Sequence, residues 1–194
     1  MGLDKRIGNK FLHPGPGYGG SCFPKDTLAL VRTAQDYDTD IGIVDEVVAY
    51  NRARKLSMAQ RVEQAAGGSV DGKTIAVLGL AFKPETDDMR DSPSLDIIPA
   101  LMAAGASIRA YDPKAMEEAR HLLPAAAALQ TSAQQCLEGA DIAVIITEWN
   151  EFRALTPDQF LTSMAGTTLV DLRNIYDPSA MRGAGLTYLS IGRD

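Results

Sequence analysis

The chain has 194 residues, of which 45% are hydrophobic and 23% charged, which is ordinary for a soluble protein with one good-sized domain or one domain plus a substantial appendage. Its net charge of −6 argues against a general nucleic-acid binder, which would carry a basic stripe. No apolar run is long enough to span a bilayer, and no apolar segment follows the first basic residues as in a signal peptide. We therefore expect a cytoplasmic protein whose two cysteines, Cys22 and Cys136, are reduced.

The first 68 residues predict an ordered loop followed by two helices. The loop is rich in glycine and proline ("HPGPGYGG") and extends to about Lys25. Its expected anchors are Phe11, Leu12, Tyr18 and Phe23. Apolar spacing predicts one helix from about Pro24 and a long second helix from about Ile43 to Ala65, ended by the Gly67-Gly68 pair. Because the second helix is longer than usual, we expect it to link two domains or to pack against a partner chain.

Strands alternate with helices after Gly72, and this order predicts parallel strands joined by helical crossovers. The apolar run 73–80 is typical of a strand buried on both faces. Further strands are expected at 107–113, 141–147, 167–172 and 186–192, with helices at 94–106, 114–123 and 132–140. The predicted fold class is α/β, with a helical segment at 1–68 followed by a Rossmann-like parallel-sheet domain at 69–194.

The loop after the first strand, "GLAFKPETDDMRDSPS", lacks the G-x-G-x-x-G pattern of a dinucleotide-binding turn. It carries two cations, Lys83 and Arg90, close to a helix start that Ser92 and Ser94 would cap. Such an arrangement could hold a phosphate or pyrophosphate. Alternatively, both cations pair with the nearby acids of the loop.

At two later strand ends, the residues could either contact a ligand or take part only in local pairing and packing. Arg173, in "DLRN", would reach either a phosphate or a neighbouring carboxylate. Glu148 and Trp149 could contact a ligand, although a tryptophan after a buried strand is more often part of the packing. The two histidines and two cysteines are too far apart in the sequence to predict a metal site.

Cys22, in "GGSCFPKD", has two interpretations. The positive end of the helix starting near Pro24 would favour a thiolate, Lys25 would add to this, and Asp26 could act as a base. The surrounding glycines would let a substrate approach the backbone. The simpler interpretation is a structural cysteine in a glycine-rich turn, and the residue pattern alone favours it.

Together, "FLHPGPGYGGSCFPKD" and "GLAFKPETDDMRDSPS" resemble the two hallmark segments of the UDP-glucose 6-dehydrogenases, within the UDP-glucose/GDP-mannose dehydrogenase family. "RIGNKF", "TEWNEF" and "DLRNIYDP" fit the same family. The resemblance covers the whole chain but only the latter part of such an enzyme. It implies the end of a central dimerisation domain and a UDP-binding domain, with the NAD-binding domain expected upstream.

The family reaction oxidises the C6 alcohol of the sugar to a carboxylate with two NAD molecules. A cysteine holds the substrate first as a thiohemiacetal and then as a thioester. The resemblance implies that Cys22 is this nucleophile and that Asp26 helps to activate water. NAD would be bound mainly by the upstream domain, so we expect the isolated chain to be inactive.

The resemblance also implies the binding residues and partners. The implied substrate-binding residues are Arg6 (reaching a neighbouring subunit), Phe11, His13, Tyr18, Gly19, Phe82, Lys83 and Arg173. Lys25 and Arg90 are implied to contact the cofactor, and the helix at about 43–65 is implied to form a homodimer. Two alternatives stay open: a dehydrogenase for GDP-mannose or another nucleotide sugar, and a sugar-nucleotide binding and dimerisation module without catalysis.

Overall fold

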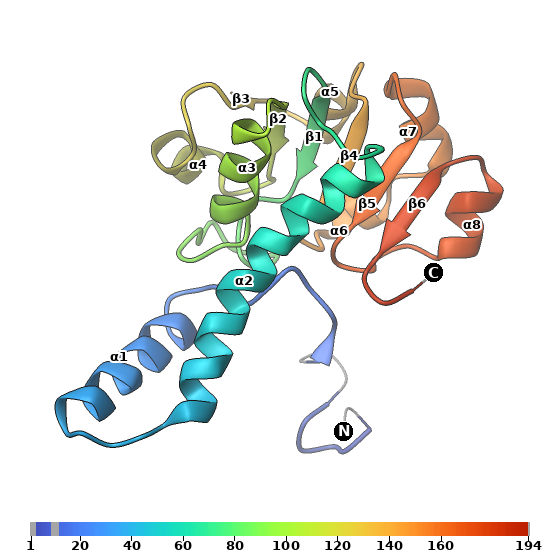
Figure 1. The fold of residues 1–194 in the computed structure, drawn as a ribbon. Coiled ribbons are helices and arrows are strands. Elements are labelled where there is room, and N and C mark those ends of the chain that lie inside the picture. Colours follow the sequence, from blue (N-terminus) through green and yellow to red (C-terminus); the bar gives the residue numbers. More distant parts are fainter. Residues whose placement is uncertain (1–2, 9–11, 194) are drawn as a thin grey trace.

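A six-stranded, all-parallel sheet forms the centre of the molecule in the computed structural model, which describes residues 3–8 and 12–193 (Figure 1). Its strand order is β3-β2-β1-β4-β5-β6. Successive strands are therefore added toward one edge from β1 to β3 and toward the other edge from β4 to β6. The strands are β1 (Thr74–Leu78), β2 (Ser107–Tyr111), β3 (Ala128–Leu129), β4 (Ile142–Ile145), β5 (Thr168–Asp171) and β6 (Thr187–Ser190). This is the doubly wound order of Rossmann-type sheets, and it confirms the predicted fold class.

Helices cover both faces of the sheet, as a continuous apolar strand such as β1 requires. Alternate side chains of β1 enter two separate cores: Ile75 and Val77 face one, and Ala76 and Leu78 face the other. The first core is closed by α2 (Gly42–Ala65), α3 (Ser94–Ala103) and α4 (Met116–Leu122). The second is closed by α5 (Ala133–Leu137), α6 (Asn150–Arg153), α7 (Pro157–Ser163) and α8 (Pro178–Gly183).

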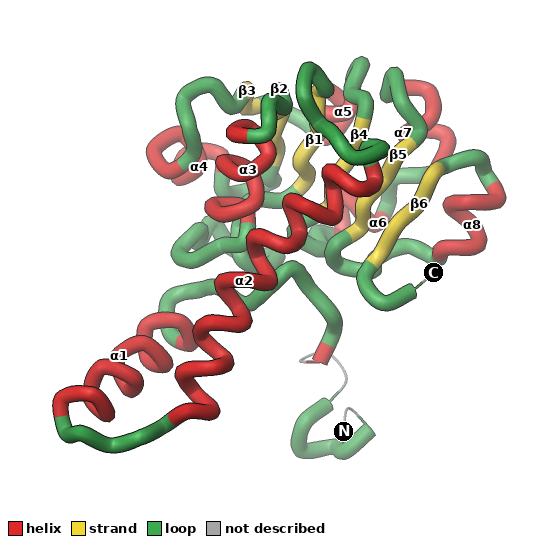
Figure 2. The backbone as a smooth tube through the Cα atoms, viewed as in Figure 1, coloured by secondary structure: helices red, strands yellow, loops and turns green. Residues whose placement is uncertain are grey.

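The helix α2 joins the sheet to a projecting hairpin that it forms with α1 (Phe23–Asp36), as Figure 2 shows. The second half of α2 packs on the sheet through Met58, Ala59 and Val62, all buried. Its first half extends beyond the sheet beside α1, where Ile43 is 84% exposed. The boundaries 42–65 agree with the predicted long helix. None of the described helices is both long and apolar enough to cross a membrane.

Some predictions require correction. The short strand β3 and the short helices α6 and α8 were not expected, because segments of two to six residues carry too little periodicity to detect. Pro93 rather than a serine occupies the N-cap position of α3, although the Ser92 hydroxyl accepts the amide of Ser94, the first residue of the helix, at 3.3 Å. Both serines are buried, and both hydroxyls donate to the carbonyl oxygen of Leu80, at 2.6 and 2.7 Å.

The anchoring of the first loop also differs from the prediction. Leu12 and Phe23 are largely exposed, and Phe11 lies outside the described residues. The loop is instead held through its backbone by polar side chains of α2.

Candidate functional site

A cavity of about 1020 Å³ opens where the first loop and α2 meet the carboxyl-terminal edge of the sheet. This edge is where open α/β sheets bind their ligands, because the strand ends and the loops that follow them diverge there. Three segments far apart in the sequence form its walls: the glycine loop (residues 13–22), the first half of α2, and the loops after β1 and β5. The lining residues used below are His13, Tyr18, Cys22, Phe82, Lys83 and Arg173.

The glycine loop is attached to α2 by two polar side chains. Asn51 accepts a hydrogen bond from the Tyr18 amide at 2.8 Å and donates one to the Tyr18 carbonyl at 3.1 Å. Arg54 donates twice to the Gly15 carbonyl, at 2.9 and 2.7 Å. These bonds pair backbone groups that a loop without regular structure would leave to solvent.

The same loop touches the loop after β1, called here the cation loop (residues 79–93). The Gly20 amide donates to the Arg90 carbonyl at 2.8 Å. Gly20 has a φ of +94°, and a Cβ there would lie 2.8 Å from the Phe82 ring. A glycine is therefore required at this position for both conformation and space.

Cys22 ends the glycine loop at the residue before α1, where it lines the cavity and is exposed. Its backbone carbonyl accepts the Asp26 amide at 2.8 Å, so the thiol lies at the first turn of α1. Unpaired amides at such a helix start create a positive local field. The thiol is 3.6 Å from the Ser21 hydroxyl.

Two cations line the cavity from the sheet side. Lys83 is exposed, with its ammonium 5.2 Å from the centre of the Phe82 ring, and no carboxylate of the described residues pairs with it. Arg173 forms an ion pair with Glu148 at 2.6 Å, and its side chain is only 16% exposed. The cavity can therefore offer positive charge to an anionic ligand beside a thiol.

Protein-family models match both parts of the chain. Residues 1–53 match the central domain of the UDP-glucose/GDP-mannose dehydrogenase family. Residues 76–178, more than half of the chain, match the UDP-binding domain of the same family. The chain belongs to the UDP-glucose/GDP-mannose dehydrogenase family.

Individual relatives agree with this family assignment. The chain is 55% identical over 193 residues to a UDP-glucose 6-dehydrogenase from Rhizobium meliloti, covering 100% of this chain and 44% of the relative. It is 42% identical to UDP-glucose 6-dehydrogenase YwqF from Bacillus subtilis, with the same two coverages. A solved UDP-glucose dehydrogenase from Pyrobaculum islandicum superposes with a TM-score of 0.77 at 35% identity, over 96% of this chain and 40% of that one. The chain thus spans less than half the length of these family members.

Several residues expected from the family resemblance lie outside the cavity lining. Asp26 forms an ion pair with Lys25 at 2.8 Å, and both side chains are mostly exposed. The hydrogen bond that Lys25 donates to Asp26, followed by the charge of Asp26, raises the pKa of Lys25. Arg6 pairs with Asp4 on the exposed arm that precedes the glycine loop.

The two cations of the cation loop differ in their surroundings. Arg90 pairs with Asp88, at 2.8 and 2.9 Å, and its hydrogen bonds hold the pKa of the Asp88 carboxyl below its ordinary value. The alternative of local ion pairing therefore applies to Arg90 and Arg173, whereas Lys83 stays unpaired among the described residues. Trp149 is part of the packing, as expected, and donates to Asp112 at 3.0 Å.

Sequence reasoning considered Glu148 only as a ligand contact, whereas the structure pairs it with Arg173. It missed three polar residues of α2 that bond to the loops at this cavity, namely Asn51, Arg54 and Lys55. A polar residue on an otherwise apolar helix face was the available signal, because such a side chain needs a bonding partner.

Proposed function

We propose that this chain supplies the nucleophilic thiol and the sugar-nucleotide pocket of an NAD-dependent UDP-glucose 6-dehydrogenase. The observation that carries the proposal is the meeting of Cys22, the Phe82-Lys83 pair and Arg173 around one cavity. These residues come from three segments, of which the outermost residues, Cys22 and Arg173, are 151 positions apart in the sequence. The 55% identity to a UDP-glucose 6-dehydrogenase supports the same substrate class.

In this proposal the cavity binds the nucleotide sugar by charge and by close backbone approach. Lys83 neutralises phosphate charge, and Arg173 turns part of its guanidinium toward the same ligand while Glu148 holds it. Tyr18 and Phe82 give apolar contact, His13 lies at the same wall, and the backbone at Gly19 lets the sugar lie close to the loop. Their convergence would bring C6 of the sugar to the Cys22 sulfur.

Cys22 then acts in covalent catalysis. When bound, NAD would supply the oxidising power: two NAD molecules in turn would each accept one hydride, and the first transfer, with loss of the hydroxyl proton, would leave C6 as an aldehyde. The Cys22 thiolate adds to the C6 aldehyde carbon, forming a C–S bond while the C=O π bond opens and its oxygen takes up a proton from solvent. After loss of the second hydride and of that proton, the carbon is a thioester. Water attacks it, the C–S bond breaks with its electron pair returning to sulfur, and Asp26 accepts the proton from the water.

Two exposed cations near Cys22 fit the phosphates of the cofactor. The side chains of Lys25 and Arg90 are 73% and 69% exposed, and they form ion pairs with Asp26 and Asp88. Each would exchange part of its present ion pair for a phosphate oxygen. The one G-x-G-x-x-G match in the sequence, at residues 15–20, does not connect a strand to a helix among the described residues as in a dinucleotide-binding domain, so we expect the main cofactor contacts to come from a separate domain of that kind.

Protection of Cys22 from alkylation tests the proposal directly. The chain is treated with iodoacetamide at increasing UDP-glucose concentrations, and the labelling of each cysteine is measured by peptide mass spectrometry. We expect UDP-glucose to slow labelling of Cys22, while the buried Cys136 stays unlabelled as an internal folding control. Equal labelling of Cys22 with and without millimolar UDP-glucose would contradict the proposal.

The same assay separates the proposal from its alternatives. Protection by GDP-mannose but not by UDP-glucose would support a GDP-mannose dehydrogenase. If this chain were a binding module without a catalytic role, it would still bind UDP-glucose. Cys22→Ser would then leave the turnover of the complete enzyme unchanged. We expect Cys22→Ser to reduce turnover of the complete enzyme by at least about a thousandfold, because a neutral hydroxyl is a far weaker nucleophile than a thiolate. The isolated chain is expected to form no NADH from UDP-glucose.

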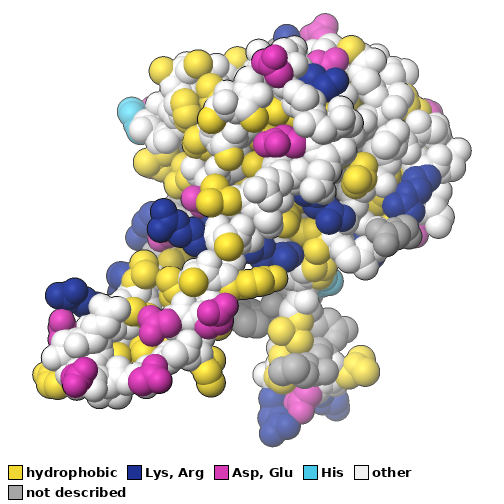
Figure 3. Space-filling view, viewed as in Figure 1, with side chains coloured by type: hydrophobic (Ala, Val, Ile, Leu, Met, Phe, Trp, Pro, Cys, Tyr) yellow, Lys and Arg dark blue, Asp and Glu magenta, His cyan; other side chains and the backbone are white. Residues whose placement is uncertain are grey.

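We also propose that the chain forms a homodimer through α2. The projecting half of this helix exposes the large apolar side chains of Ile43, Val47 and Tyr50, of which Val47 and Tyr50 also line the cavity. Figure 3 shows hydrophobic side chains along the hairpin. Exposed apolar surface of this kind marks a protein contact. In such a dimer Arg6, on the exposed arm, would reach the substrate of the neighbouring subunit.

A further inference from the structure

We propose that Asn51 and Lys55, one turn apart on α2, are positioning residues that fix the glycine loop against the cation loop and thereby place the Cys22 thiol. Neither residue touches the reacting atoms in this assignment. The inference rests on the proposed function to the extent that Cys22 is the reacting group. The placement of the loop itself can be tested without that assumption.

Asn51 recognises the backbone of Tyr18 in the way a neighbouring strand would. Its Oδ1 accepts the Tyr18 amide at 2.8 Å and its Nδ2 donates to the Tyr18 carbonyl at 3.1 Å. Only an amide side chain offers a donor and an acceptor at this spacing. An aspartate at this position would keep the acceptor and lose the donor.

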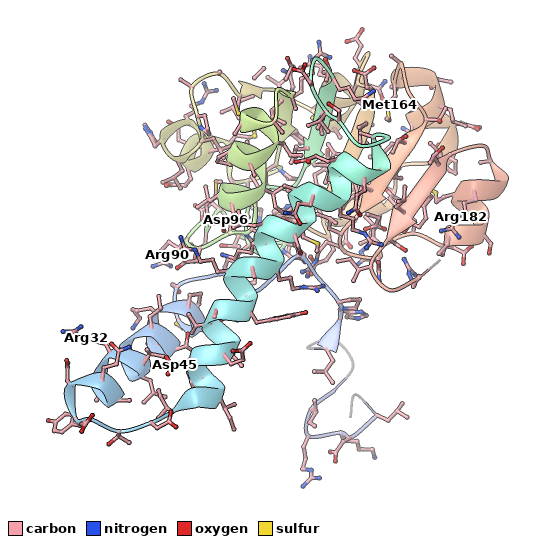
Figure 4. All side chains as sticks on the ribbon, viewed as in Figure 1. Arg32, Asp45, Arg90, Asp96, Met164 and Arg182 are labelled. Atoms are coloured by element: carbon pink, nitrogen blue, oxygen red, sulfur yellow. The ribbon has the colours of Figure 1, made fainter. Side chains whose placement is uncertain are left out.

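Lys55 connects the same helix face to the cation loop. Its ammonium donates to the Asp91 carbonyl at 2.9 Å and lies 3.2 Å from the Asp96 carboxylate, while the side chain is only 8% exposed. Burial of a charge is unfavourable unless partners compensate it, so a buried lysine holds strongly to those partners. In Figure 4 Asp96 and Arg90 are labelled close to the point where α2 passes α3.

The two loops meet at the residues that Asn51 and Lys55 hold. A Cβ on Gly17 would lie 2.8 Å from Cγ of Lys55, and a Cβ on Gly19 would clash with the Asp91 carbonyl oxygen. Asp91 itself has a φ of +51°, a conformation that costs energy for a residue with a side chain. The Lys55 bond to its carbonyl stabilises this conformation and therefore the surface on which Gly19 rests.

Packing alone does not hold the loop on this side. A second cavity of about 370 Å³ lies between α1 and α2, bordered by Tyr18, Asn51, Lys55, Asp91 and Asp96. The loop could shift into this space if its polar bonds were lost. Cys22 follows Tyr18 by four residues, so such a shift would move the thiol relative to Phe82 and Lys83.

Hydrogen exchange of this chain measures the placement of the loop. We compare Asn51→Ala, Asn51→Asp and Lys55→Met with Gln60→Ala, a control at an exposed position on the same helix. Peptides from residues 12–23 are expected to exchange about tenfold faster in Asn51→Ala and Lys55→Met, and less so in Asn51→Asp, which keeps one bond. Peptides from β1 and β4 should not change, which separates loosening of the loop from loss of the fold.

Alkylation of Cys22 then relates loop placement to ligand binding. In the same variants, we expect the UDP-glucose concentration that protects Cys22 from iodoacetamide to rise about tenfold relative to Gln60→Ala. If the unsubstituted chain shows no protection, the proposed function fails, and hydrogen exchange still decides the positioning role. Unchanged loop exchange in both Asn51→Ala and Lys55→Met, with intact sheet peptides, overturns the inference. The inference is also overturned if UDP-glucose protects Cys22 in the unsubstituted chain and does so at the same concentration in Asn51→Ala and Lys55→Met.

Discussion

At the scale of single residues, Asp112 connects the segments that form the sheet side of the cavity. It is completely buried at the end of β2. One carboxylate oxygen accepts the amides of Leu80 and Ala81 and the indole N–H of Trp149, at 2.7 to 3.0 Å. The other accepts two amides of the following turn, both at 2.9 Å. The first residues of the cation loop are therefore fixed by one side chain.

We predict that Asp112→Ala lowers the free energy of unfolding by about 3 kcal/mol, because it leaves several buried N–H donors without an acceptor. Guanidinium denaturation followed by circular dichroism measures the change. Asp158→Ala, in the first turn of α7 on the protein surface, is the control and should change the value by less than about 0.5 kcal/mol. A small effect of Asp112→Ala would show that water replaces the carboxylate.

Cys136 is buried against β1 and gives the stability a pH dependence. Burial raises the pKa of its thiol from 9.0 to about 12. Because the unfolded thiol loses its proton first, the stabilising contribution is complete below pH 9 and is lost as the pH rises toward 12. We predict that the free energy of unfolding falls by about 1.4 kcal/mol between pH 8 and pH 10 from this group. Denaturation at both pH values, compared with Cys136→Ala, measures the difference.

If the free energy of unfolding fell no more steeply between pH 8 and pH 10 in the unsubstituted chain than in Cys136→Ala, this assignment would be contradicted.

Tyr111 contributes to the pH dependence of stability at higher pH. Burial, then the charge and hydrogen bond of Glu151, raise the pKa of Tyr111 to about 12. Its stabilising contribution is therefore complete well below pH 10, the ordinary pKa, and is lost as the pH rises from about 10 toward 12.

At the scale of elements, α2 has two halves with different tasks. Residues of the second half, such as Val62, are buried on the sheet. In the first half, side chains are more exposed, and Val47 is an example at 41%. Between them, Asn51, Arg54 and Lys55 bond to the two loops at the cavity. One rigid helix therefore sets the distance between the sheet, the site and the hairpin.

Matched substitutions on α2 test this division. We predict that Val62→Ala lowers the free energy of unfolding by about 2 kcal/mol, because it leaves a cavity in a closely packed core. Val47→Ala removes the same atoms from a partly exposed side chain and should cost less than about 0.5 kcal/mol in the monomer. Both values come from chemical denaturation at low protein concentration. Similar losses for the two variants would contradict the division.

At the scale of the whole molecule, the hairpin of α1 and α2 projects from the sheet and carries exposed apolar side chains such as Ile43. Figure 1 shows it extending away from the layered sheet, while the glycine loop lies where hairpin and sheet meet. The site is therefore adjacent to the proposed dimer contact. Events at that contact could reach the glycine loop through α2.

We predict that Ile43→Glu shifts the chain from dimer to monomer in sedimentation experiments, because it places a charge in an apolar contact. Leu122→Glu is the matched control: Leu122 is 50% exposed at the end of α4, on the sheet domain. It should leave the oligomeric state unchanged. Equal sedimentation of Ile43→Glu and the unsubstituted chain would remove α2 from the dimer contact.

The sequence by itself determined the alternation of strands and helices, the long helix and the position of Cys22 at a helix start. These features are local, because apolar periodicity and glycine or proline signals act over a few residues. The two hallmark segments also identified the family. The brief elements β3, α6 and α8 escaped detection, since so few residues carry no readable period.

Only the tertiary structure decided which polar groups meet at the site. Arg90 and Arg173 pair with nearby carboxylates, whereas Lys83 has no carboxylate partner within the described part of the chain. This difference depends on distances between segments, which the sequence does not contain. The same holds for Asn51 and Lys55, whose bonds to Tyr18 and Asp91 cross more than 30 positions. Periodicity shows which face of a helix is buried, but hydrogen bonds are directional and short, so their partners follow only from the folded arrangement.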